Sequence, residues 1–344
     1  MAVRPAPDPQ FDRALGALLG VAIGDAMGMP SQTLSRDEIR SAYGEIVDFV
    51  DAAPDQPVSA GLKAGTITDD TEQSLLLARH LIERRGGFDE LVWARSLRDW
   101  ERDIRARGLK DLLGPSTNRA IEALSRGVPP EQVGRLGTTN GAAMRIAPVG
   151  VATPLEPLGA FVDAIEATCR LTHNTSEAIG AAAAVAAVFS AGVSGSDFET
   201  ALPIALEAAR LGERRGAAPL RGLVSHRIAR ASRLAEERAG GDAATIALEI
   251  GTSVAAIESV PMAFAIARLA GHDAWRAAVL SANVGDDTDT IGAIACGMCG
   301  ACRGAASLPA EKARLVVAVN ALDLEPLIDA LLRLRRRANP GGAP

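Results

Sequence analysis

The sequence predicts an all-α fold, and three observations support this. Hydrophobic residues make up 48% of the 344 residues but aromatic residues only 3%, so alanine, leucine, valine and isoleucine must build the core. Alanine is the strongest helix former, and such small side chains let helices pack closely. Apolar residues recur at helical spacing, and no convincing run alternates with the period of two expected for a strand. We therefore expect one compact domain of more than ten helices.

The first predicted helix covers residues 11–27. Four glycines in and just after it recur at every fourth position and share one helix face, where a second backbone can approach closely: Gly16, Gly20, Gly24 and Gly28. Close helix packing explains these glycines. It does not explain Asp25, an acidic residue among small and apolar neighbours.

The rest of the chain follows the same helical pattern. A short helix is expected over 36–44, and a loop over 51–65 leads into an acidic stretch. Loops of this length beside candidate site residues are more often functional than idle. A polar turn at 137–145 enters a further helix. The other helices are predicted over 70–85, 88–107, 116–126, 157–172, 176–191, 197–211, 220–238, 243–250, 258–270, 272–282, 288–302, 309–319 and 323–336.

The domain is expected to span residues 11–337. Residues 1–10 are proline-rich without the apolar segment of a signal peptide, and we expect them to be disordered. Residues 338–344 are expected to form a flexible tail.

Composition excludes several classes of function. A formal net charge of −6 disfavours the nucleic-acid backbone as a partner. No apolar run is seen to reach the ~18–20 residues of a membrane span. Four cysteines in a chain of this size do not suggest a disulfide framework, so we expect a cytoplasmic protein. Cys296, Cys299 and Cys302 are interpreted as small thiols of a tightly packed helix rather than iron–sulfur ligands.

Two acidic stretches at predicted helix starts carry the chemistry. They are Thr66-Ile67-Thr68-Asp69-Asp70-Thr71 and Gly285-Asp286-Asp287-Thr288-Asp289-Thr290-Ile291-Gly292. Each alone is also typical of helix capping, but three carboxylates in four positions exceed what one cap needs. Carboxylate and hydroxyl oxygens without nearby cysteine or paired histidine select Mg²⁺, Mn²⁺ or Ca²⁺. If the stretches meet, they can hold two ions roughly 3.5–4 Å apart, which activates water and orients a polyol or phosphate.

The sequence resembles the ADP-ribosylglycohydrolase family, and the resemblance spans about residues 11–330. It rests on both acidic stretches and three further motifs, all in the family's order: Gly24-Asp25-Ala26-Met27-Gly28, Thr139-Asn140-Gly141-Ala142-Ala143-Met144-Arg145 and Thr172-His173. The nearest branch is a bacterial one that also carries the Met29-Pro30-Ser31 and Gly114-Pro115-Ser116 segments.

The resemblance implies a compact all-α fold with two Mg²⁺ or Mn²⁺ ions. One half of the metal site would come from Thr68, Asp69 and Asp70. The other half would come from Asp287, Asp289 and Thr290. Asp69, Asp70 and Asp289 would also act in catalysis. The residues expected along ADP-ribose or an ADP-ribosylated substrate are Gln32, Asn140, Gly141, Ala143, Met144 and His173.

Two positions depart from the family pattern. Gln32 stands where many active members have a glutamate near the metals, and a neutral amide cannot act as a general base. Asp286 stands where members usually have glycine, and it would add a carboxylate beside the ligands. Glu258 is interpreted either as an ordinary helix-start acid or as a residue lining the pocket.

The resemblance therefore implies a metal-dependent hydrolase of the glycosidic bond of ADP-ribose. One alternative is a nucleosidase, or a hydrolase of another ribosyl metabolite, on the same site. A second, suggested by Gln32, is a protein that binds ADP-ribose or a nucleotide without turnover. A third is a packing protein like a lens crystallin of this family, and the complete set of metal ligands argues against it.

Overall fold

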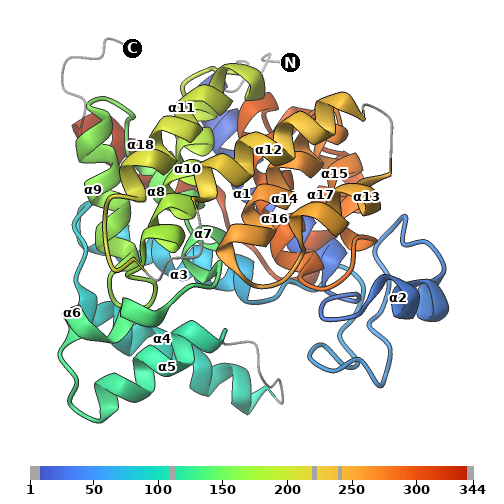
Figure 1. Ribbon diagram of the computed structural model, residues 1–344, viewed down its shortest axis with the longest axis horizontal. Coiled ribbons are helices and arrows are strands. Elements are labelled where there is room, and N and C mark those ends of the chain that lie inside the picture. Colours follow the sequence, from blue (N-terminus) through green and yellow to red (C-terminus); the bar gives the residue numbers. More distant parts are fainter. Residues whose placement is uncertain (1–7, 108–113, 219–222, 239–241, 339–344) are drawn as a thin grey trace, which may run out of the picture.

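The computed structural model describes residues 8–107, 114–218, 223–238 and 242–338, and over these residues it is all-α (Figure 1). Here the only β pairing is two isolated bridges, Thr139–Ala255 and Thr175–Ala217. The predicted fold class is confirmed. The longer helices are α1 (Pro9–Gly28), α2 (Arg36–Tyr43), α3 (Asp69–Glu83), α4 (Glu90–Ala106), α5 (Pro115–Ser125), α9 (Leu158–Cys169), α10 (Ser176–Val193), α11 (Phe198–Gly212), α12 (Val224–Glu237), α13 (Ala243–Ile250), α14 (Ala256–Leu269), α15 (Ala274–Ala282), α16 (Thr288–Arg303), α17 (Ala310–Val319) and α18 (Glu325–Ala338).

Short helices account for most of the segments that the sequence pattern left unassigned. They are α6 (Pro130–Val133), α7 (Gly141–Met144), α8 (Ala147–Ala152) and the 3₁₀ turns η1 (Gly134–Leu136) and η2 (Ala305–Ser307). Helix α1 begins two residues before the predicted domain start, because Asp8 caps it and Pro9 suits a first helical turn. Of the segment 1–10 expected to be disordered, residues 8–10 form the cap and start of α1, and of the tail expected over 338–344, Ala338 ends α18. Residues 1–7 and 339–344 lie outside the described residues.

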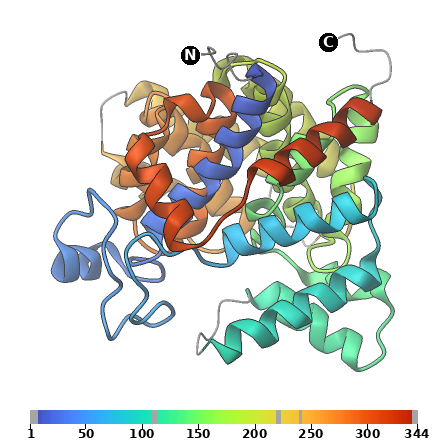
Figure 2. The same cartoon turned by 180° about the vertical axis from the view of Figure 1, so that it is seen from behind.

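Helices α1 and α16 lie side by side in the middle of the molecule (Figures 1 and 2). A Cβ atom added at Gly16, Gly20 or Gly24 would collide with the α16 backbone, at Gly300, Cys296 and Gly292 respectively. Added at Gly28, it would collide with the backbone of Asp289. The glycine face of α1 therefore lets the two backbones touch, as the recurrence of glycine at every fourth position predicts. This contact brings the end of α1 directly against the start of α16.

Helix α10 is the core helix beside this pair. By length and composition Ser176–Val193 would also qualify as a membrane span, yet 94% of that window is buried inside the structure. The expectation that no apolar run reaches that length was therefore wrong for this helix. Its many alanines make it apolar enough, and the surrounding helices cover it completely.

Two arginines, the half-buried Arg13 and the buried Arg335, hold helix ends together. Arg13 of α1 donates from Nη1 to the carbonyls of Gly192 and Cys302, which lie near the ends of α10 and α16. Arg335 of α18 donates to the carbonyl of Thr153 and to both the carbonyl and the hydroxyl of Ser190. A cation suits the free carbonyls at helix C-termini. An arginine-rich run near a helix C-terminus, such as 333–337, is typical of a solvated face, and for Arg335 this interpretation of the sequence was wrong.

Two outer units flank the helical core. Helices α4, α5 and α6 form a layer below it in Figure 1, and α2 with the following loop lies to one side. That loop is tied to the turn after α1: Gln56 Nε2 donates to the carbonyl of Gln32 at 2.7 Å, and Ser59 Oγ donates to that of Met29 at 2.7 Å. The loop expected over 51–65 therefore packs beside the turn that carries Gln32.

Candidate functional site

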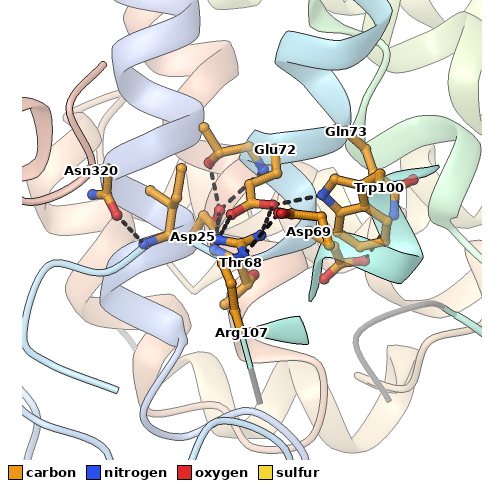
Figure 3. Close-up of polar contacts among 11 residues, drawn as sticks. Asp25, Thr68, Asp69, Glu72, Gln73, Trp100, Arg107 and Asn320 are labelled. Carbon is orange, nitrogen blue, oxygen red and sulfur yellow. Dashed lines mark hydrogen bonds and ion pairs between the residues drawn. The ribbon is translucent and has the colours of Figure 1, made fainter. Parts of the chain in front are cut away.

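Asp25 joins the glycine helix to the first acidic stretch. Its carboxylate is fully buried and accepts hydrogen bonds from the backbone N–H and the hydroxyl of both Thr68 and Thr71. Thr68 makes no side-chain cap of its own, so Asp25 caps α3 from a different helix (Figure 3). This explains an acidic residue among the apolar residues at the end of α1, and it sets the position of Asp69 and Asp70.

The two acidic stretches meet, although about 200 residues separate them in sequence. Asp69 and Asp70 at the start of α3 and Asp289 at the start of α16 each offer a carboxylate oxygen, and these atoms lie within 4.8 Å of one another. Thr290 Oγ1 donates to Asp70 Oδ2 at 3.3 Å. The close approach of α1 to α16, together with the Asp25 cap on α3, produces this cluster.

The electrostatics of the cluster suit a bound cation. Burial, followed by repulsion from Asp289, raises the pKa of Asp69 and of Asp70 well above the usual range. Burial, followed by repulsion from Asp25, raises the pKa of Asp289 to about 7. Asp70 Oδ1 and Asp289 Oδ1 are buried without a hydrogen-bond partner. Crowded carboxylates with free buried lone pairs are the environment that a hard divalent ion stabilises.

Asp287 lies beside this cluster and has a different partner. Its Oδ2 accepts a short hydrogen bond from Asn140 Nδ2, which also donates to Ser259 Oγ at 2.8 Å. The hydroxyl of Thr68 donates its hydrogen to Asp25 at 2.6 Å, which leaves the lone pairs of the hydroxyl oxygen as acceptors. Of the six predicted metal ligands, three carboxylates therefore form the tight group, and Thr68, Asp287 and Thr290 surround it.

A cavity of about 120 Å³ adjoins the carboxylates. Seven of the predicted site residues line it together with five others. The seven are Asp69, Asn140, Gly141, Met144, Asp287, Asp289 and Thr290, and the five are Gly114, Pro115, Thr117, Thr139 and Val254. Sequence reasoning assigned no site role to these five. The Thr139–Ala255 bridge holds the 137–141 turn against the residues before α14, and this places Thr139 and Val254 on neighbouring segments of the wall.

His173 lies behind the cavity wall and does not line it. Its ring is fully buried, with Nε2 3.0 Å from Thr139 Oγ1 and Nδ1 2.8 Å from Thr172 Oγ1. Gly141 leaves room for the ring, since a Cβ atom there would lie 2.9 Å from His173 Cε1. Burial, reinforced by the charge of Arg145, holds the pKa of His173 well below its usual value, so the ring is neutral. His173 therefore lies behind two residues of the cavity wall, Thr139 and Gly141.

Arg145 links the carboxylate cluster to the residues behind the cavity wall, Thr172 and His173. Its guanidinium is buried, lies over the ring of Trp93, and donates to Gln73 Oε1 at 2.7 Å and to Thr172 Oγ1 at 2.8 Å. Gln73 Nε2 in turn lies 3.4 Å from Asp69 Oδ2. Burial lowers the pKa of Arg145 to about 10, which still leaves it charged.

Glu72 lies three residues after Asp69, yet its carboxylate accepts hydrogen bonds from the end of another helix, α4. It accepts a hydrogen bond from Trp100 Nε1 at 2.6 Å and a bidentate pair from Arg107 at 2.9 and 2.8 Å (Figure 3). These contacts attach α4 to the start of α3. On the other side, Asn320 accepts from the N–H of Ile67 and donates to the carbonyl of Gly65. The first acidic stretch is thus held from both sides.

The remaining predicted residues lie outside the cavity wall. Gln32 is buried in the turn after α1, and its Nε2 has no hydrogen-bond partner. Ala143 is buried within α7. Asp286 has a φ of 64°, a left-handed value that suits glycine, and its side chain lines a neighbouring hollow beside Thr33 and Thr252. The extra carboxylate therefore does not join the three clustered ones.

Glu258 is a structural residue. Its Oε2 accepts hydrogen bonds from the hydroxyl of Ser253 at 2.6 Å and from the backbone N–H of the same residue at 3.2 Å. It stands in the first turn of α14, so the helix-start interpretation of the sequence was correct.

Comparisons with known proteins show which family the chain resembles over nearly its whole length. A sequence model of the ADP-ribosylglycohydrolase family matches residues 6–341. An uncharacterised Escherichia coli protein, YegU, is 34% identical over 95% of this chain and 98% of its own. The ADP-ribosylarginine hydrolase Tri1 of Pseudomonas putida is 28% identical over 89% of this chain and 74% of its own. A solved ADP-ribosylglycohydrolase-related protein superposes with a TM-score of 0.64 at 26% identity, covering 96% of this chain and 99% of that one.

Proposed function

The chain belongs to the ADP-ribosylglycohydrolase family, whose members hydrolyse glycosidic bonds, and from this premise we propose that it is a metal-dependent hydrolase of ADP-ribosylated substrates. The observation that carries the metal dependence is the carboxylate cluster of Asp69, Asp70 and Asp289, with its two unpartnered buried oxygens. We infer that these residues would hold one or two Mg²⁺ or Mn²⁺ ions, aided by Thr68, Asp287 and Thr290. Ions of this kind, when bound, orient ribose hydroxyls and lower the pKa of a water.

The protein's own residues contribute position and charge. Asp25 orients the start of α3 through Thr68 and Thr71, and Asn140 orients the Asp287 carboxylate. With ions bound, the clustered aspartates are ionised. An ionised aspartate beside the cavity can accept a proton from an attacking water, which is a role the neutral amide of Gln32 cannot fill.

The ligand proposed for the cavity is the ADP-ribosyl group. Asn140, Gly141 and Met144 line the cavity together with the aspartates, at the motif by which the chain resembles its family. The acceptor that carries ADP-ribose would be a protein, a nucleic acid or a small molecule. The Pseudomonas putida relative is named for ADP-ribosylarginine, which makes arginine-linked ADP-ribose the first substrate to try.

The four cysteines are buried and free, which supports a reducing, cytoplasmic setting.

The proposal is tested by removing single ligands of the cluster. We expect Asp69→Ala and Asp289→Ala each to lower turnover of an ADP-ribosylated peptide by about a thousand-fold or more, since metal-ion catalysis supplies several kcal/mol of barrier lowering. Asp197→Ala, which removes an exposed helix cap away from the site, is the matched control and should retain activity. Undiminished turnover in either cluster variant would contradict the proposal.

Calorimetric titration of ADP-ribose, with Mg²⁺ and again after chelation, separates the alternatives. Metal-dependent binding of ADP-ribose, together with release of ADP-ribose from an ADP-ribosylated peptide in a separate turnover assay, supports the hydrolase. Metal-dependent binding without such release favours a binding protein, and no binding in either condition points to another riboside.

A further inference from the structure

The segment between α13 and α14, residues 251–255, connects two parts of the site. The N–H of Asp287 donates to the carbonyl of Thr252 at 3.0 Å, and the N–H of Asn140 donates to the carbonyl of Val254 at 2.9 Å. Val254 also lines the cavity. We call residues 251–255 the bridging loop, because it holds the second acidic stretch and the 137–141 turn at positions only two residues apart.

The side chains of Asn140 and Asp287 meet in front of this loop. Asn140 Nδ2 donates a short hydrogen bond to Asp287 Oδ2 and another to Ser259 Oγ at 2.8 Å. Both Asn140 and Asp287 line the cavity. Since the loop holds the backbone of each, its shape sets where the amide and the carboxylate lie. Small displacements of such groups weaken binding and catalysis strongly.

The half-buried Arg227 of α12 fastens the two ends of the bridging loop. Its Nη2 donates to the carbonyl of Ile250, the last residue of α13, and its Nε donates to the carbonyl of Ile257 in the first turn of α14. Neither carbonyl has the usual helical donor, because Ile250 ends its helix and Pro261 carries no N–H to give to Ile257. One planar guanidinium therefore serves an acceptor on each side of the loop.

Glu258 holds the middle of the bridging loop. Its Oε2 accepts from the hydroxyl of Ser253 at 2.6 Å and from the N–H of the same residue at 3.2 Å. The carboxylate also lies against Gly251, where an added Cβ atom would be 2.5 Å from Oε2. Gly251 has a φ of 86°, a left-handed value that lets the chain turn at the end of α13. The loop is thus held at both ends by Arg227 and in its middle by Glu258.

We propose that Arg227 and Glu258 are positioning residues for substrate binding. They fix the bridging loop, and the loop fixes Asn140 against Asp287 at the cavity wall. Neither Arg227 nor Glu258 is among the residues that line the cavity. The inference deepens the proposed function and, for the identity of the ligand, rests on it. Affinity for the ADP-ribosyl group then depends on an arginine of a helix outside the site.

The first test is amide hydrogen exchange, followed by NMR in the ligand-free protein. Arg227→Met keeps the apolar stem of the side chain and removes both donors. We expect the amides of Asn140 and Asp287 to exchange about ten-fold faster or more, because the carbonyls that they donate to lose their support. Amides in the middle of α10 report global stability and should keep most of their protection.

Arg230→Met is the matched control for this test. Arg230 lies three residues later on the same helix and pairs with the exposed carboxylate of Glu249 at 2.9 Å. Its removal should leave the amides of Asn140 and Asp287 unchanged. Unchanged exchange in Arg227→Met, or a loss of protection as large in α10 as at these two amides, would overturn the positioning role.

The second test is calorimetric titration of ADP-ribose in saturating Mg²⁺. Arg227→Met should bind about ten-fold more weakly than wild type, and Arg230→Met within about two-fold of it. Glu258→Ala should also bind about ten-fold more weakly, whereas Glu258→Gln keeps an acceptor oxygen for Ser253 and should bind within about two-fold. Thermal midpoints are measured alongside. Arg227→Lys, which can reach only one of the two carbonyls, replaces Arg227→Met if the latter does not fold.

The outcomes separate the two proposals. Equal affinity of wild type and Arg227→Met overturns the role of Arg227 in substrate binding while leaving the proposed function intact. If wild type itself fails to bind ADP-ribose, the proposed function falls, and with it the role of Arg227 toward that ligand. The exchange measurement then still decides whether Arg227 fixes the bridging loop.

Discussion

At the scale of single residues, Asp25 is the group that most directly connects packing to the site. Its carboxylate satisfies four donors at the start of α3, which has no cap of its own. Burial raises its pKa to about 6, whereas the hydrogen bonds from Thr68 and Thr71 oppose that shift. Burying the Asp25 carboxylate therefore destabilises the fold. Removing it would destabilise the fold more, because four buried donors would lose their acceptor.

We expect Asp25→Ala to lower the free energy of unfolding by about 3 kcal/mol or more. Asp197 is a matched control, since it caps α11 at an exposed position through Thr200 N, and Asp197→Ala should cost only about 1 kcal/mol. Urea unfolding is measured in saturating Mg²⁺, so that relief of repulsion within the cluster does not mask the loss. Equal losses in the two variants would show that Asp25 acts as an ordinary cap.

At the scale of helices, the α1–α16 contact determines where the second half of the site lies. The glycines of α1 face backbone atoms of α16 along its whole length, so there is no space in which a methyl group can be placed. Side chains relax around an added atom, but two packed backbones do so poorly. The helices must instead move apart, and Asp289 would move away from Asp69 and Asp70.

We expect Gly24→Ala to destabilise the fold by about 3 kcal/mol and to weaken Mg²⁺ binding, because its Cβ atom would meet the backbone of Gly292 and Ala293. Gly159→Ala is the control: it lies in α9, is exposed, and has open space around its Cβ position. There alanine should be neutral or stabilising by up to about 1 kcal/mol, through helix propensity. Thermal unfolding and metal titration measure both effects. Unchanged metal affinity in a folded Gly24→Ala protein would show that the helix contact does not set the ligand positions.

At the scale of the whole molecule, the buried carboxyls couple stability to pH and metal. Burial raises the pKa of Asp25 to about 6 and that of Asp289 to about 7, above the ordinary aspartate value of 3.8. The folded protein then binds protons more tightly than the unfolded chain does. By linkage, the free energy of unfolding of the metal-free protein falls as pH rises from about 4 through about 7.

We expect the thermal midpoint in chelator to fall between about pH 5 and about pH 8, and added Mg²⁺ to raise it by several degrees. The increment from Mg²⁺ should grow with pH, because ionised carboxylates bind the ion and repel one another without it. Calorimetric scans with and without chelator check both statements. Asp289→Asn should flatten the pH dependence in chelator. A midpoint in chelator that rises with pH would contradict the account.

Helical periodicity and composition predicted nearly every long helix, because each of these helices shows its buried face locally in its own residues. The glycine spacing of α1 also predicted a close helix contact correctly. The short helices α6, α7 and α8 were missed or left open because they are held by neighbours rather than by a repeat of their own. The burial of Arg335 was not predicted for a related reason. Its partners are carbonyls of α8, of Thr153 just after α8, and of α10, all far away in sequence.

For the site, the residue types predicted the chemistry of the ligands: two acidic helix starts, rich in hard oxygen donors, within the order of motifs that the chain shares with its family. The convergence of Asp69, Asp70 and Asp289, the capping of α3 by Asp25 from another helix, and the position of Asp286 away from the cluster depend on the folded arrangement. Likewise, His173 was expected in the cavity, whereas the structure puts Thr139 in front of it. The reason is physical: residue type fixes which atoms can bind, but the crossing of backbones far apart in the chain fixes which of them meet.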